Sequence, residues 1–288
     1  MKIPGIAHRS DLAGLGITDA ARRRLLRKGR IMRVGAWYVT GDAPEEIVLL
    51  LRRGVRPSCV TAAEHHGLWV PLHTGHHVYR PRGLGVEKHD QGLAERGQDL
   101  MEHDQALVEH GSEMRSWPDQ DPVAELSLTL EHAVRCLSVP DAAILLESAL
   151  NRRSISRHGV RRVLAALPAA RRAQLNRVTP LAESGTETAV RWWLESLHVP
   201  VTPQVQIPGV GRVDLQLGAS WIIECDSVRF HDNPEQYHRD RARDLRLQAR
   251  RYMVTRLTWE QVFLDWEETK SQLLQILRRR DHCRPIAG

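Results

Sequence analysis

The chain has 288 residues, and 41 basic against 35 acidic side chains give it a formal charge of +6 and a pI near 9.5. This length allows two domains, and the basic balance favours a polyanionic partner. The four cysteines lie far apart without a Cys-x-x-Cys pair, which argues against a zinc ribbon and a disulfide framework. No apolar run reaches the length of a membrane span and the first residues lack a signal-peptide core, so we expect a cytoplasmic protein.

The first eighty residues contain the parts of a winged helix-turn-helix. Ser10 and Asp11 can cap a short helix that ends at Leu15, and Thr18 can cap a second helix over residues 20–28. Residues 31–39 then predict a tight hairpin that turns at Gly35-Ala36. In such a domain the second helix enters a major groove and the hairpin lies beside the DNA backbone.

The predicted second helix and the residues after it are strongly basic. Seven of the twelve positions from 22 to 33 are Arg22, Arg23, Arg24, Arg27, Lys28, Arg30 and Arg33. These side chains can reach phosphates or base edges of DNA, or can form only a solvated helix face. The segment, with residues 57–68, resembles the N-terminal winged-helix domain of the AbiE-type antitoxins. That resemblance implies DNA binding and allows a toxin as protein partner.

Five histidines follow in residues 65–77, at positions 65, 66, 73, 76 and 77. Neither a cysteine nor an acid lies near them at a spacing typical of zinc sites, and Gly67–Pro71 breaks the helix between the pairs. We therefore interpret them as surface or helix-packing residues.

The middle of the chain is expected to be mainly helical. Residues 81–121 are polar and rich in glycine, which is typical of a linker with a few short strands. Apolar spacing then predicts helices over residues 123–136, 140–150, 154–167 and 168–178. We expect domains at 1–80, 81–180 and 181–288. The basic surface of the middle segment can touch DNA or simply keep the protein soluble.

Two strands near the C-terminus place acids among apolar residues. The strands are expected at Arg212–Leu217 and Trp221–Cys225, with a turn at residues 218–220 between them. Asp214 lies on the first strand, and Glu224 and Asp226 lie at the end of the second. Carboxylates on adjacent strands can converge on one point, and their hard oxygens suit Mg²⁺ or Mn²⁺. Such an ion can activate a water molecule and neutralise charge on a phosphate.

This acidic pattern resembles the active-site motif of the PD-(D/E)xK nuclease superfamily, and within it the relatives of very-short-patch-repair endonucleases. The matching features are Asp214, Glu224-Cys225-Asp226, Phe230-His231, Asp240–Asp244, the strand Tyr252–Thr258, the acidic helix start Glu183–Glu187 and Gln204. The resemblance implies a C-terminal restriction-endonuclease-like mixed sheet flanked by helices. With the winged helix and the helical middle unit, the chain is expected to be an α/β protein, α+β overall.

The resemblance also implies roles for individual residues. Asp214, Glu224 and Asp226 would bind the metal ion, and Glu187 could complete its shell or help to hold a second ion. His231 could orient or protonate a group of the substrate, and Arg241 or Arg243 could neutralise its phosphate. The function implied is a metal-dependent DNA endonuclease.

Two departures from the motif keep an alternative open. The usual Lys two positions after the Glu is Asp226 here, and Ser227 replaces a common Gly. The acids could also pair with Arg212, Arg241 or Arg243 and only hold the sheet edge. The alternative is an antitoxin-like DNA-binding repressor that keeps a catalytically silent nuclease fold.

Overall fold

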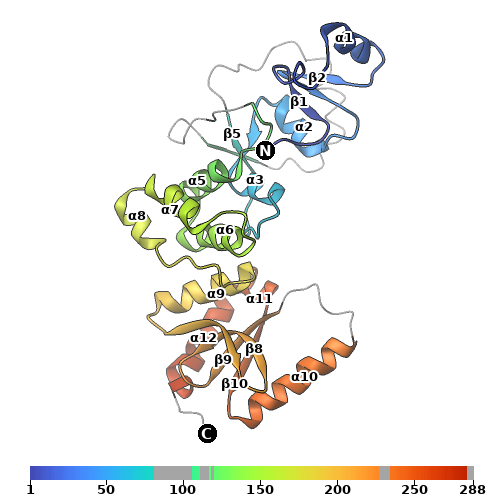
Figure 1. Cartoon of the computed structure of the whole chain (residues 1–288). Coiled ribbons are helices and arrows are strands. Elements are labelled where there is room, and N and C mark those ends of the chain that lie inside the picture. The colour runs from blue at the N-terminus through green and yellow to red at the C-terminus, as the bar shows by residue number, and fades with distance from the viewer. Residues whose placement is uncertain (81–105, 111–116, 118–119, 227–233, 284–288) are drawn as a thin grey trace. The chain divides into compact units, whose positions relative to one another are not determined.

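A computed structural model describes residues 1–80, 106–110, 117, 120–226 and 234–283 (Figure 1). His231, for which a role in catalysis is predicted, lies outside this part of the chain. The described chain is a mixture of helices and three small sheets. It forms two compact units, one built mainly from residues 1–68 and 73–137 and the other from 138–160 and 169–288. Short exchanged segments, 69–72 and 161–168, belong to the second and first unit respectively.

The first unit begins with a small antiparallel sheet in the order β1-β3-β2. Its strands are β1 (Ile6–His8), β2 (Met32–Val34) and β3 (Trp37–Val39). The pairing of β2 with β3 confirms the predicted hairpin, and Gly35 turns the chain with a φ of 54°. Helix α1 (Asp19–Arg27) precedes the hairpin, and Thr18 caps it through a 3.2 Å bond from the Ala21 N–H.

The expected first helix, from Ser10 to Leu15, is wrong. Residues 11–16 form successive turns, in which only Leu15 donates to a carbonyl four positions earlier, that of Asp11. Gly14 and Gly16 weaken a helix at this point because glycine gives up the most backbone freedom on ordering. The described chain therefore has one helix before the hairpin, where a helix-turn-helix requires two.

The rest of the first unit combines a mixed sheet with three helices. The sheet has the order β4-β5-β6, with β4 antiparallel and β6 parallel to β5. The strands are β4 (Arg56–Pro57), β5 (His76–Tyr79) and β6 (Leu107–His110), and the helices are α2 (Glu45–Arg52), α3 (Cys59–His65) and α5 (Leu126–Cys136). Leu128 of α5 and Ile47 of α2 are fully buried in the core of this unit.

Helices were expected through the middle of the chain, and the structure contains α6 (Val139–Asn151), α7 (Arg157–Ala165) and α8 (Ala169–Gln174) there. Ser138 caps α6 and Pro140 occupies its first turn, where the missing N–H of proline costs nothing. Within the second unit, Glu147 of α6 is fully buried and pairs with Arg191 of α9 (Gly185–Ser196). Trp192 and Thr188 also donate to Glu147, so the buried charge is fully bonded.

The second unit is centred on a four-stranded sheet in the order β10-β9-β8-β7. Its strands are β7 (Val201–Ile207), β8 (Gly211–Leu217), β9 (Trp221–Asp226) and β10 (Met253–Thr258). The first three are antiparallel neighbours, and β10 returns parallel to β9 after helix α10 (Pro234–Ala249). The predicted strands at residues 212–217 and 221–225 and the turn at 218–220 are confirmed.

Helices cover both faces of this sheet (Figure 1). On one face, Trp221 and Ile223 of β9 pack with α9, α11 (Trp259–Phe263) and α12 (Trp266–Arg279). Ile222 points the opposite way and packs with Leu247 of α10. The alternation places the side chain of Glu224 on the α10 face. No helix in the described chain is long and apolar enough to cross a membrane.

Candidate functional site

Asp214 and Glu224 meet where strands β8 and β9 separate. The pairing of β8 with β9 ends at Leu215 opposite Ile223, so Asp214 and Glu224 are the next residue on each strand beyond the last pair. The Asp214 carboxylate accepts a 2.8 Å hydrogen bond from the Cys225 N–H, and the Asp214 and Glu224 carboxyl groups lie close enough to interact electrostatically. Burial raises the pKa of both groups, that of Glu224 to about 8, and the adjacent Asp214 charge adds to the effect on Glu224.

Glu187 joins this pair from the first turn of α9. Its carboxylate accepts from the Glu183 N–H at 3.0 Å, the Ser184 hydroxyl at 2.9 Å and the Gln204 amide at 2.8 Å. Burial, followed by the charge of Asp214, raises the pKa of Glu187 to about 7. The amide oxygen of Gln204 is buried without a hydrogen-bond partner among the described residues, and Gln204 has a left-handed φ of 54°.

Two arginines neutralise the outer acids. Arg243 of α10 pairs with Glu224 and also donates to the Arg212 carbonyl. Arg256 of β10 pairs with Asp226 at 2.8 Å and holds Asp244 through two nitrogens. Asp226 is 43 % exposed, so its ion pair is the more accessible of the two.

The structure brings the four predicted acids around one residue, Cys225. Burial raises the pKa of its thiol, and the charges of Asp214, Glu187, Glu224 and Asp226 raise it further. No three of these carboxylates come within metal-ligand spacing of one another in the described chain, and arginines pair with Glu224 and Asp226. Of the two arginines predicted to face the phosphate, Arg241 is exposed, and Arg243 pairs with Glu224. Sequence analysis did not identify Arg256 as a partner of the acids. The pattern that could have identified it is a single cationic residue in an otherwise apolar strand.

The basic residues of the N-terminal region lie on an open surface. Helix α1 has no buried residue, and Arg23, Arg24, Arg27, Lys28, Arg30 and Arg33 are exposed. Arg22 is half-buried, pairs with Asp19 at 3.0 Å and lies over the Tyr38 ring. This arrangement leaves most of the predicted DNA-binding side chains accessible to a polyanion.

Among the five histidines of residues 65–77, His77 is buried on strand β5. Its ring lies with Cys59, His110 and Cys136 in a buried group that could hold a metal ion, although the ion itself is not defined. The ligand atoms of the four residues all lie within 4.8 Å of one another. Sulfur and imidazole ligands are unlike those of Mg²⁺. Reading the sequence for close spacing missed the group because its members come from four separate elements.

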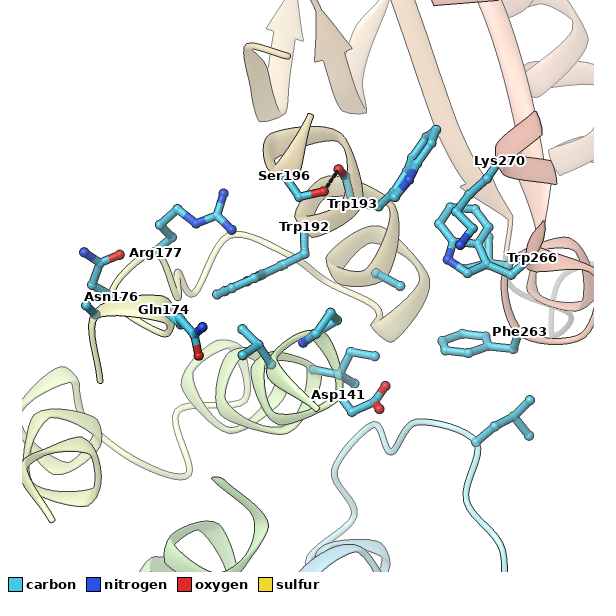
Figure 2. Close-up of a pocket in the computed structure, with 17 residues that line it drawn as sticks. Asp141, Gln174, Asn176, Arg177, Trp192, Trp193, Ser196, Phe263, Trp266 and Lys270 are labelled. Carbon is cyan, nitrogen blue, oxygen red and sulfur yellow. Dashed lines mark hydrogen bonds between the residues drawn. The ribbon is translucent and has the colours of Figure 1, made fainter. Parts of the chain in front are cut away.

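A cavity of about 800 Å³ also lies within the second unit (Figure 2). Trp192 and Trp193 of α9, Phe263 and Trp266 line it, and Arg177 and Lys270 lie at its wall. Arg177 is 4.6 Å from the Trp192 ring centre, which fixes one side of the cavity. None of the predicted acids lines this cavity.

Comparison with models of known protein families gives no match for this chain. Comparison with curated proteins also gives none.

Proposed function

We propose that the chain is a metal-dependent DNA endonuclease whose active site is formed by Asp214, Glu224 and Glu187. The observation that carries the proposal is the half-buried Asp214 carboxylate beside two buried carboxyl groups, those of Glu224 and Glu187. Buried acids are costly unless something compensates them, and clustered acids with raised pKa values are typical of functional sites. The mixed sheet with helices on both faces is also the arrangement that the nuclease resemblance implies.

The donor atoms are of the chemical type that a hard divalent cation such as Mg²⁺ or Mn²⁺ prefers, and three of them would bind one ion only after the acids move closer together. Asp214, Glu224 and Glu187 supply carboxylate oxygens, and the amide oxygen of Gln204 is buried without a partner among the described residues. Asp226 can contribute from the outer edge, because its pair with Arg256 is partly exposed. When bound, the cation would activate a water molecule and neutralise charge on the scissile phosphate.

The protein's own residues can move the charges and protons that hydrolysis requires. Arg243 can turn from Glu224 to a phosphate oxygen, which leaves the Glu224 carboxylate free to act as a ligand. Glu187, with a pKa of about 7, can take up or return a proton near neutral pH. Arg256 can hold Asp226 and Asp244 in place during these changes.

DNA recognition is assigned in the same proposal to α1 and the β2–β3 hairpin. The arginines of α1 and Arg33 of the hairpin are exposed, so both elements offer positive charge to DNA. Contacts from such side chains to phosphates position DNA without requiring a particular sequence.

A second candidate is an antitoxin-like repressor, which would bind DNA and a toxin but cleave nothing. The ion pairs Glu224–Arg243 and Asp226–Arg256 favour it, because they neutralise the acids without a metal ion. Asp226 in place of the usual Lys favours it as well.

Cleavage of plasmid, single-stranded and mismatched DNA with Mg²⁺ or Mn²⁺ separates the two candidates. Glu224→Gln keeps the shape of the side chain and removes its negative charge. We expect this variant to lose cleavage by on the order of 100-fold or more, since a cation bound to the acids supplies several kcal/mol of transition-state stabilisation. DNA binding should remain, because it is assigned to the other unit.

Glu267→Gln is the matched control, since Glu267 is 89 % exposed on α12 and pairs with Lys270 across one helical turn. It should cleave as the parent does. Equal cleavage by the parent and Glu224→Gln would show that the activity lies elsewhere or belongs to a contaminant. A parent that binds DNA but cleaves none of the three substrates with either ion would favour the repressor.

A further inference from the structure

Four potential metal ligands converge in the first unit from elements far apart in the sequence. Cys59 begins α3, His77 lies in the middle of β5, His110 ends β6 and Cys136 ends α5. Cys59, His77 and His110 are at most 7 % exposed, and Cys136 is partly buried. They belong to a different unit from the predicted acids and are not used by the proposed nuclease reaction.

Strand pairing explains why the two histidines share one side of the sheet. Strands β5 and β6 are parallel, with His77 opposite Val108 and Tyr79 opposite His110. Because side chains alternate along a strand, positions 77 and 79 project to one face, as do 108 and 110. The two rings lie with centres 5.4 Å apart, and His77 Nδ1 is 3.5 Å from the Cys136 sulfur.

The bonding of the group is incomplete without a further atom. Nε2 of His110 is buried without a hydrogen-bond partner among the described residues. A buried polar nitrogen without a partner is uncommon and costs free energy. The contact between the Cys136 sulfur and His77 Nδ1 leaves the His110 nitrogen unsatisfied. A metal ion at the centre would satisfy all four residues.

The backbone around the ligands is held in place before any ion binds. The Ser58 N–H donates to the His77 carbonyl at 2.9 Å, and the His77 N–H donates to the Thr61 hydroxyl at 2.8 Å. Cys59 has a left-handed φ of 50°, a conformation that a cysteine adopts only where its surroundings require it. These bonds fix the N-terminus of α3 against β5, so two of the four ligands are preorganised.

We propose that Cys59, His77, His110 and Cys136 form a structural zinc site. Two thiolates and two imidazoles are a zinc-binding set, and thiolates exclude the hard ions Mg²⁺ and Ca²⁺. With Zn–S bonds of about 2.3 Å and Zn–N bonds of about 2.0 Å, ligand atoms of a tetrahedral site lie roughly 3.3 to 3.8 Å apart. A spacing of at most 4.8 Å therefore needs only a small contraction.

The proposed ion has a structural rather than a catalytic role. Four protein ligands complete the coordination and leave no position for water or substrate. Two thiolates balance the double charge of the ion, so a neutral centre is buried. The ion ties β6, a strand of four residues, to β5 and to the ends of α3 and α5.

Metal analysis of the full chain, purified under reducing conditions without a chelator, tests this proposal. We expect about one zinc ion per chain, and Co²⁺ in its place should give the visible bands of a tetrahedral site and sulfur-to-metal charge transfer. Cys136→Ser and His110→Gln should each retain less than about a tenth of the zinc of the parent after dialysis, since even outer-shell changes cost 10–100-fold in affinity.

The chain offers matched controls for both ligand types. Cys283→Ser changes an exposed thiol, and His76→Gln changes the residue next to His77, which points to the other face and pairs with Glu46. Both should retain zinc as the parent does. Zinc retained in Cys136→Ser, or loss of zinc from both control variants, would overturn the assignment.

A measurement on the parent alone covers the case in which ligand variants do not fold. Zinc should protect Cys59 and Cys136 from alkylation while Cys283 reacts, and a mercurial that attacks thiols should release the ion. A parent without zinc even after exposure to Zn²⁺, or a disulfide between Cys59 and Cys136, would refute the site.

Discussion

Replacing Glu187 with Gln should flatten the dependence of stability on pH. Glu187 is 4 % exposed, and its pKa is raised from 4.5 to about 7, by burial first and then by Asp214. The folded state therefore holds the proton more tightly than the unfolded state does. The resulting stabilisation is full below pH 4.5 and is lost as pH rises through about 7.

The magnitude follows from the size of this shift. Each pKa unit corresponds to about 1.4 kcal/mol, so the parent should lose about 3 kcal/mol of unfolding free energy from this group between pH 4.5 and 7.5. Glu187→Gln cannot titrate and should lack that contribution. The amide oxygen can still accept from the Glu183 N–H and from Gln204, and Ser184 can accept from the new amide. We therefore expect the substitution itself to cause only a small, pH-independent change in the unfolding free energy.

Urea unfolding at a series of pH values, followed by tryptophan fluorescence, measures the difference. Of the eight tryptophans, Trp37 and Trp117 lie in the first unit and the other six in the second, so the signal reports mainly the unit with the acids. Buffers should be freed of divalent ions by resin, since a chelator would also remove zinc from the proposed cysteine–histidine site. Glu183→Gln, a change at an exposed neighbour, is the control.

Parallel pH profiles for the parent and Glu187→Gln would refute the reasoning. That result would mean that Glu187 ionises as freely in the folded chain as in the unfolded one. A control that flattens as much as Glu187→Gln would likewise show that the effect does not arise from the buried carboxyl.

Two further predictions concern the ion pair inside the second unit and the basic helix of the first. Arg191→Met should lower the unfolding free energy by about 3–5 kcal/mol in the same urea assay, because it leaves Glu147 buried without its charge partner; a loss below 1 kcal/mol would contradict it. The double variant Arg23→Ala with Arg27→Ala should weaken DNA binding. It should also make the plot of log binding constant against log salt concentration less steep, by the amount expected for the loss of roughly two phosphate contacts. Arg278→Ala, at an exposed position on α12, is its control, and an unchanged slope in the double variant would contradict DNA contact by α1.

Local patterns in the sequence were sufficient for much of the second unit. The turn at 218–220 and the alternation of apolar residues predict β8 and β9 with bounds that differ from the structure by one residue. The helix start expected at Glu183–Glu187 from the resemblance agrees with α9, which Ser184 caps. These elements are defined by periodicity and capping, which act over a few residues.

The contacts of the acids depended on packing that no local pattern contains. Glu224 meets Arg243 only because α10 crosses that face of the sheet, and Asp226 meets Arg256 only because β10 lies parallel to β9. The cysteine–histidine group is an extreme case, because its ligands extend from position 59 to position 136. Zinc motifs are recognised by short spacings, and this group has none.

At the start of the chain, local patterns predict an element that the structure does not contain. Capping residues before positions 11–16 predict a helix there, but the segment is too short and too rich in glycine to repeat the helical hydrogen bond. Local signals were present, and the cost of helix nucleation outweighed them.

The central claim is that the acids around Asp214 form a cation site and not merely an edge neutralised by arginine. A crystal of the full chain grown with Mn²⁺, measured at the manganese absorption edge, tests it most directly. We predict an anomalous peak in contact with oxygens of Asp214 and Glu224, with the Arg243 guanidinium displaced from Glu224. Arg243 still bound to Glu224 with no manganese beside Asp214 would contradict the claim.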